Sequence, residues 1–126
     1  MRTARTLSAW CLAMAVPAVA CAATIYVDAD APGFQNGTSW MNAFVYLQDA
    51  LASATTGDTI RVAEGVYRPN QATGPVITDR TATFQLKTGV GLYGGYAGYG
   101  QPSPNDRNVA LYKTVLSGDL DGNDLI

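Results

Sequence analysis

The residues best suited to chemistry lie near the C-terminus, where oxygen-bearing side chains surround a glycine. They are Asp119, Asp121, Asn123 and Asp124. Hard oxygen ligands on a short flexible segment are typical of calcium sites. The glutamate spacing of an EF-hand loop cannot be tested, because the sequence ends at Ile126. An ordinary solvated turn is the favoured alternative, since Asp, Asn and Gly also form turns through local backbone bonds.

Acid–base chemistry has few candidates elsewhere. The chain contains no histidine, which excludes an imidazole base or an imidazole metal site. Asp58, Glu64, Asp79 and Asp106 are the carboxylates that could act in pairs, as glycoside cleavage requires. None of them lies in a recognisable catalytic motif, so no catalytic residue is assigned.

Residues 1–23 have the pattern of an export signal. Arg2 and Arg5 precede an apolar run from Leu7 to Val19, and small residues then give two A-x-A cleavage patterns, Ala18–Ala20 and Ala20–Ala22. The apolar run is shorter than the roughly 20 residues of a transmembrane helix. We therefore expect a secreted or cell-surface protein without a transmembrane span; a buried N-terminal helix is the less favoured alternative.

Export changes how the two cysteines are interpreted. Cys11 and Cys21 both lie in the signal, so cleavage after Ala22 leaves a mature chain without cysteine. Cleavage before Cys21 would instead leave a lipoprotein anchored through that residue, although the preceding residues resemble a lipobox only weakly. Loss of two arginines takes the formal net charge from −2 to −4. With no basic patch, nucleic acid is not an expected partner.

An N-terminal unit is expected over residues 24–57. It begins with a short strand at Ile25–Val27 and a turn-rich loop, and it continues with an amphipathic helix. Thr38 and Ser39 are suitable N-caps, and Gly57 is a suitable stop. The apolar residues at helical spacing are Trp40, Phe44, Leu47, Leu51 and Ala54.

Short strands follow over residues 58–126. Thr59–Ala63 alternates, with Ile60 and Val62 on one face and Arg61 on the other. Apolar blocks begin near Ile60, Phe84 and Val115, about 24 to 31 residues apart, a spacing at which solenoid repeats are expected. The further strands expected are Val66–Tyr67, Thr83–Lys87, Val90–Tyr93 and Thr114–Ser117.

Several segments together carry a family resemblance. They are Ile25–Ala31, Asn36–Trp40, Leu47–Leu51, Gly57–Tyr67, Phe84–Lys87, Leu92–Tyr96 and Leu116–Asp119. As a set they resemble the start of secreted right-handed parallel β-helix proteins of the pectin-lyase-like superfamily. The resemblance covers most of the chain after the signal, and it is more specific for fold than for activity.

The resemblance implies an all-β fold, a right-handed parallel β-helix (solenoid) of which the chain holds the first coils only. The amphipathic helix, through Trp40, Phe44, Leu47 and Leu51, would cap the open end of the first coil. The bore would be lined by Ile60, Val62, Phe84, Leu86 and Leu92. No second cap is visible before Ile126, which favours a truncated chain over a complete domain whose last strand is covered by a partner.

Three functions are compatible with this resemblance. The favoured one is a non-catalytic N-terminal cap and first coils of an extracellular or cell-surface protein that contacts polysaccharide or other cell-surface components. The alternatives are the front end of a polysaccharide lyase or hydrolase with its active site on later coils, and a calcium-stabilised module. No cofactor other than calcium is expected. The family's lyases use a basic residue, for which Arg61, Lys87 and Arg107 are the candidates. Tyrosines available for sugar stacking are Tyr67, Tyr93, Tyr96, Tyr99 and Tyr112.

Overall fold

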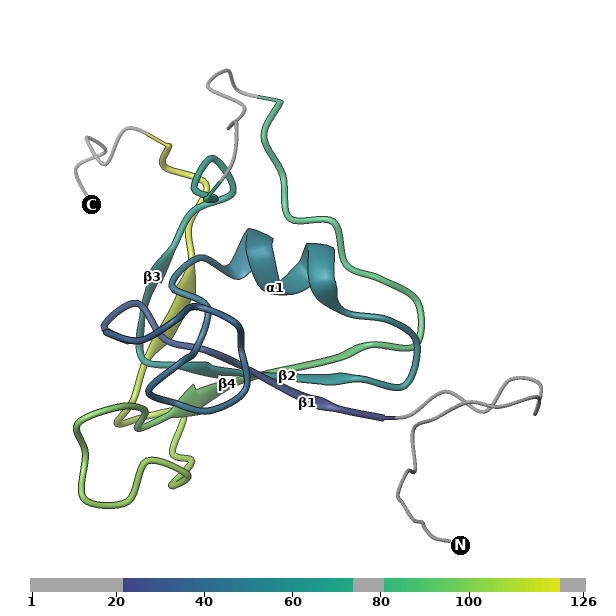
Figure 1. The fold of residues 1–126 in the computed structure, drawn as a ribbon. Helices are drawn as coiled ribbons and strands as arrows, with labels where there is room; N and C mark the ends of the chain where they lie inside the picture. Colours follow the sequence, from purple (N-terminus) through teal and green to yellow (C-terminus); the bar gives the residue numbers. More distant parts are fainter. Residues whose placement is uncertain (1–21, 74–80, 121–126) are drawn as a thin grey trace, which may run out of the picture.

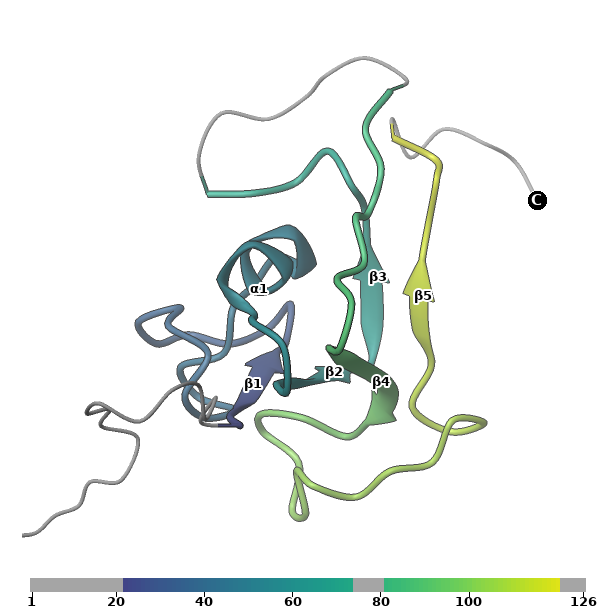
Figure 2. The ribbon, with the colours of Figure 1, turned by 90° about the vertical axis from the view of Figure 1, so that its right-hand side faces the viewer.

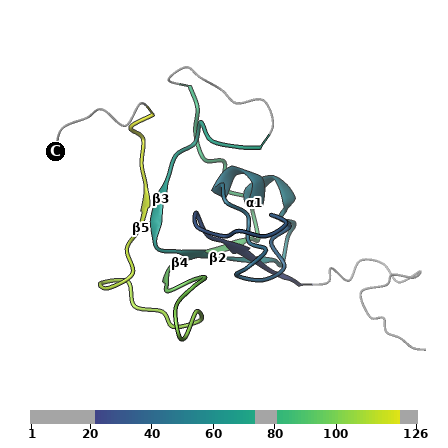
Figure 3. The same ribbon diagram turned by 60° about the vertical axis from the view of Figure 1, so that its left-hand side comes forward.

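The computed structural model describes residues 22–73 and 81–120, which form two short parallel sheets and one helix. The first sheet has the order β1 (Thr24–Val27), β2 (Thr59–Ala63), β4 (Gly91–Tyr96), and the second pairs β3 (Gly65–Tyr67) with β5 (Thr114–Leu116). The sheets meet at a corner, and α1 (Leu47–Ser53) lies inside it (Figures 1, 2 and 3).

The core follows from the alternation of side chains along β1 and β2. Ile25 and Val27 lie in register with Ile60 and Val62, and all four are buried. The apolar side of α1 closes this layer with Leu47, Ala50 and Leu51. Because neighbouring strands present the same face at the same register, one apolar layer forms between the sheet and the helix.

Thr114 secures the corner between the sheets. Its hydroxyl donates toward the carbonyl oxygens of Val62 (3.2 Å) and Ala63 (3.0 Å), and it accepts from the backbone N–H of Gly95 (2.9 Å). One side chain of β5 therefore bonds to the backbone of both β2 and β4. These contacts fix the second sheet against the first where the chain turns from β2 into β3.

The predicted all-β right-handed parallel β-helix is wrong. Strand pairing is parallel, as expected, but the described residues form a small mixed structure with one three-stranded and one two-stranded sheet, and no solenoid coils are detected among them. The predicted strand Thr83–Lys87 contains no strand residue, and Leu86 is 66% exposed rather than inside a bore. In place of a strand, this segment is bonded to the helix region through the side chains of Gln48 and Lys87.

Two side chains, those of Gln48 and Lys87, bond residues 83–87 to other segments. The Gln48 side-chain amide donates to the carbonyl oxygens of Pro69 (2.6 Å) and Thr83 (2.9 Å). The Lys87 ammonium donates to the carbonyl oxygens of Ala52 (3.1 Å) and Ala54 (2.9 Å), at the C-terminal end of α1. A helix end offers unpaired carbonyls and a partial negative charge, so a lysine there is favourable.

The predicted helix start was also wrong, because the backbone of Phe44 pairs with β1. Its N–H donates to the Tyr26 carbonyl and its own carbonyl accepts from Asp28, both at 2.9 Å. Trp40 and Phe44 therefore precede α1, which begins at Leu47, and Ser39 accepts from the Asn42 N–H instead of capping a helix. Leu47 and Leu51 do lie on α1 and are buried, as expected.

The remaining expectations divide between the described residues and those outside them. Strands were predicted correctly near β1, β2, β3, β4 and β5, within one to three residues at their ends. The export signal lies outside the described residues except for Ala22 and Ala23. Within residues 22–73 and 81–120, no helix is long and apolar enough to cross a membrane.

Replacing Leu47 by alanine tests the packing of α1. Leu47 is 1% exposed in the core, so Leu47→Ala is expected to lower the free energy of unfolding by about 2–5 kcal/mol. Leu86→Ala is the matched control, because Leu86 is 66% exposed and its change is expected to stay within about 0.5 kcal/mol. Denaturant unfolding measures both. Equal losses would contradict the placement of these two leucines.

Candidate functional site

The outer face of the first sheet is built by three residues at one register position. Tyr26 of β1 pairs with Arg61 of β2, and Arg61 pairs with Tyr93 of β4. Their neighbours Ile25, Ile60 and Leu92 form the adjacent register position. Since successive side chains point to opposite faces of a strand, Tyr26, Arg61 and Tyr93 share the face that points away from the core.

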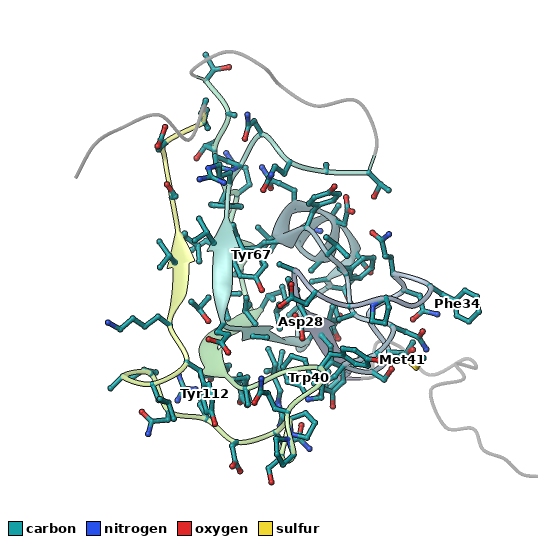
Figure 4. All side chains as sticks on the ribbon, turned by 90° about the vertical axis from the view of Figure 1, so that its left-hand side faces the viewer. Asp28, Phe34, Trp40, Met41, Tyr67 and Tyr112 are labelled. Atoms are coloured by element: carbon teal, nitrogen blue, oxygen red, sulfur yellow. The ribbon has the colours of Figure 1, made fainter. Side chains whose placement is uncertain are left out.

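Ring contacts extend this outer face. Trp40 meets Tyr26 edge to face, with centroids 4.8 Å apart, and Tyr96 at 5.7 Å. Trp40 is buried, and its indole N–H donates to the Asn105 side-chain oxygen at 2.8 Å. Figure 4 shows Trp40 and the core residue Tyr67 on opposite sides of the first sheet. Trp40 thus packs against the outer rings of Tyr26 and Tyr96 instead of capping the core.

Two guanidinium groups lie over these rings. The Arg61 carbon Cζ is 5.5 Å from the Tyr96 ring centre, and the Arg107 Cζ is 5.6 Å from Tyr93 and 5.8 Å from Tyr96. Arg107 also donates from Nε to the Gly94 carbonyl at 2.8 Å, which orients its planar group. We call Tyr26, Arg61, Tyr93, Tyr96 and Arg107 the tyrosine–arginine face.

The tyrosine–arginine face carries two guanidinium charges, although the whole chain is acidic. Within residues 22–73 and 81–120, neither Arg61 nor Arg107 forms an ion pair, and the buried Nε of Arg61 has no hydrogen-bond partner. A guanidinium carries five N–H donors and no acceptor. The exposed Arg107 therefore brings N–H donors to the face beside Tyr93, which is 46% exposed.

This arrangement is suited to binding and not to acid–base catalysis. An exposed aromatic ring offers an apolar surface to a flat ligand, while the neighbouring guanidinium donates to hydroxyl or anionic oxygens. Arg61 and Arg107 were candidate bases, but a guanidinium stays protonated in proteins. Lys87, the third candidate, bonds to the end of α1. In the described residues, no three His, Cys, Asp or Glu side chains are grouped to hold a metal.

Tyr67 and Asp28 are two buried polar residues, and each is hydrogen-bonded to the backbone. The Tyr67 hydroxyl donates to the Ala63 carbonyl at 3.0 Å and accepts from the Ala29 N–H at 3.3 Å. Burial raises the pKa of Tyr67 well above its usual range. Figure 4 shows its side chain pointing from β3 into the interior. Tyr67 is therefore not a stacking surface for sugars, as its sequence position had allowed.

Backbone donors hold the Asp28 carboxylate. Its two oxygens accept from the N–H groups of Asp30 (2.9 Å) and Tyr99 (2.6 Å). Burial raises the pKa of Asp28, while these two hydrogen bonds oppose the rise. Gly98 adopts φ +83°, and a Cβ there would lie 2.5 Å from both Asp28 Oδ2 and the Ala63 Cβ. The loop can approach Asp28 this closely because residue 98 has no side chain.

Asp58, one of the candidate carboxylates, is also held by hydrogen bonds. Its carboxylate accepts from the N–H of Ala23 (3.0 Å), the N–H of Thr55 (2.9 Å) and the Thr55 hydroxyl (3.3 Å). The bonds from Thr55 are the main reason that its pKa is lowered, and burial opposes them. An acid held ionised by three donors is a poor proton donor near neutral pH.

The predicted calcium segment is only partly described. Asp119 lies in the described residues, whereas Asp121, Asn123 and Asp124 lie outside them. The Arg68 Nε donates to the Asp119 carbonyl oxygen at 2.7 Å. A guanidinium at this distance repels a cation bound to the same segment. Calcium binding here stays a prediction.

Comparisons with known proteins add no assignment. No family model, no curated protein and no solved structure matches the chain. The resemblance to the pectin-lyase-like superfamily therefore stays untested, apart from its fold, which the structure contradicts.

Sequence reasoning missed the tyrosine–arginine face as a unit. It found Tyr93, Tyr96, Arg61 and Arg107 separately, and it placed Arg61 opposite Ile60 and Val62 correctly. The alternation Ile25-Tyr26-Val27 carried the same signal for Tyr26. What the sequence lacks is the register, which brings these residues together from three strands.

Asp58→Asn tests the lowered pKa of Asp58. An acid whose pKa falls on folding stabilises the fold above its unfolded pKa, about 3.9, and this contribution disappears as pH falls through the folded value. We expect Asp58→Asn to cost about 1–3 kcal/mol at neutral pH, with the difference from the unmodified chain shrinking below about pH 4. Denaturant unfolding at several pH values measures this. Asp106→Asn, on an exposed residue, is the control. A constant difference at every pH would contradict the pKa direction.

Calorimetry tests the calcium prediction. We expect weak binding to the unmodified chain, with a dissociation constant of about 10⁻³ M or higher, because the ligands are few and Arg68 lies beside Asp119. The double variant Asp119→Ala/Asp121→Ala is expected to lose that heat. Equal heats from the two proteins, or no heat from either, would identify the segment as an ordinary turn.

Proposed function

We propose that this chain is an exported, non-catalytic module that contacts extracellular polysaccharide through the tyrosine–arginine face. The observation that carries the proposal is the exposed Tyr93 ring beside Arg107, on the sheet face opposite the core. The pattern of residues 1–23 supports export, to the cell surface or beyond it. Nucleic acid and a membrane span form no part of the proposal.

The face fits a glycan by its shape and its donors. The C–H groups of a sugar ring pack on an aromatic ring, and its hydroxyl groups accept hydrogen bonds from a guanidinium. Arg107 is suited to this, because it is exposed and its bond to Gly94 uses Nε and not a terminal nitrogen. Trp40 and its bond to Asn105 keep Tyr26 and Tyr96 in place, which limits the entropy lost on binding.

The alternative, the front end of a polysaccharide lyase or hydrolase, has less support in the described residues. The basic candidates stack on rings or bond to carbonyls, and Asp28 and Asp58 accept hydrogen bonds from the backbone. A non-catalytic role requires no change in these contacts. Of the other candidate carboxylates, Glu64 and Asp106 lie in the described residues and Asp79 lies outside them.

Binding to immobilised polysaccharides tests the proposed function. Tyr93→Ala is expected to weaken binding about tenfold, the value of one aromatic contact of about 1.4 kcal/mol. Tyr99→Ala is the matched control, since Tyr99 is 40% exposed but has no ring contact with the face. Arg107→Lys keeps the charge but loses the planar stack, so it is expected to weaken binding as well.

Two results would contradict the proposal. Equal losses for Tyr93→Ala and Tyr99→Ala, or no binding to any polysaccharide tested, would show that the face is not a glycan site. Release of unsaturated or reducing sugars by the chain alone would show that it is an enzyme.

A further inference from the structure

Asp58 lies beside the backbone nitrogen of Ala23, immediately before β1. The Ala23 nitrogen is 3.0 Å from Asp58 Oδ1, and the Ala23 carbonyl accepts from the Thr59 N–H at 2.9 Å. Asp58 is only 6% exposed. Both backbone groups of Ala23, its N–H and its carbonyl, therefore bond the start of β1 to the start of β2.

The Asp58 carboxylate has hydrogen-bond donors but no cation. Its bonds come from Ala23 and Thr55, and no charged side chain contributes to its pKa shift or pairs with it in the described part of the chain. A buried carboxylate is normally paired with a positive charge, because removing an ion from water is costly. Of the two backbone nitrogens that donate to Asp58, the Ala23 nitrogen is the one that cleavage of the chain can turn into a cation.

The sequence allows that nitrogen to become a cation. Ala20-Cys21-Ala22 is one of the two A-x-A patterns, and cleavage after it makes Ala23 the first mature residue. Water adds to the Ala22 carbonyl carbon and the bond to the Ala23 nitrogen breaks. Ala22 leaves as a carboxylate, and the released amine takes up a proton to become an ammonium group.

We propose that the export signal is removed between Ala22 and Ala23, and that the new α-ammonium group of Ala23 forms an ion pair with Asp58. The inference rests on the proposed export. The acceptor of this bond is already ionised, so cleavage adds the attraction of a second full charge at the same position. Removal of the signal would thus stabilise the strand that begins the first sheet.

The competing cleavage site places the charge elsewhere. Cleavage before Cys21, the lipoprotein alternative, leaves the Ala23 nitrogen as an internal amide two residues from the terminus. Asp58 would then keep a neutral donor at 3.0 Å and have no cation. The two cleavage sites therefore predict different partners for the same carboxylate.

The mass of the exported protein, measured on the chain secreted by an export-competent host, is the first test. We expect a chain that begins at Ala23. A mature chain beginning at Cys21, with or without lipid, would overturn this inference but leave export intact. A chain that keeps residues 1–22 would overturn the proposed export itself.

Stability of the mature chain is the second test. A form beginning at Ala22 carries the same charge one residue further away, and a form acetylated at the Ala23 nitrogen keeps the N–H but loses the charge. Each is expected to shift the unfolding equilibrium constant by about tenfold toward the unfolded state, about 1.4 kcal/mol. In an Asp58→Asn background the two changes are expected to have little effect, since the partner charge is gone.

The pH dependence gives an independent readout. A terminal amine paired with a carboxylate has a raised pKa in the folded state, so its contribution is complete below the unfolded value of about 8 and is lost as pH rises through the folded one. The unmodified mature chain should therefore lose this stability above about pH 8, whereas the acetylated form should not. Identical alkaline profiles and identical stabilities for the two forms would contradict the ion pair.

Discussion

The in-register pairing of β1, β2 and β4 is the constraint on which the rest of the structure depends. Ile25, Ile60 and Leu92 occupy one register position, and Tyr26, Arg61 and Tyr93 occupy the next. A shift of one residue in a strand would exchange its two faces, and in β2 it would bury Arg61 in the core. The same backbone bonds therefore position both the apolar layer under α1 and the tyrosine–arginine face.

The buried side chains of Asp28 and Tyr67 are both hydrogen-bonded, which leaves the exposed chemistry to the outer face. Asp28 accepts from two backbone N–H groups, and the Tyr67 hydroxyl both donates and accepts. These hydrogen bonds stabilise one arrangement of the chain, and burial keeps both groups away from a substrate. Arg61 and Arg107 differ, because their charges lie on aromatic rings without a carboxylate partner in the described residues.

Local patterns predicted the strands, but they did not show which segments bond to one another across long distances in the sequence. Thr59–Ala63 alternates, and β2 has those bounds with Ile60 and Val62 buried. Thr83–Lys87 alternates equally well but forms no strand, because Gln48 and Lys87 hold it to other segments. Phe44 has helical spacing to Leu47 and Leu51, yet its backbone pairs with β1. Both errors arise from long-range bonds that the sequence does not display.

Solution NMR tests the central claim most directly, because it observes both faces of the first sheet in one experiment. The account predicts side-chain contacts from Arg61 to Tyr26 and Tyr93, and separate contacts from Ile60 to Ile25 and Leu92. On titration with a bound polysaccharide, signals of Tyr93 and Arg107 should move while those of Ile25 and Ile60 stay in place. Contacts of Arg61 with the core residues, or shifts confined to the core, would contradict the account.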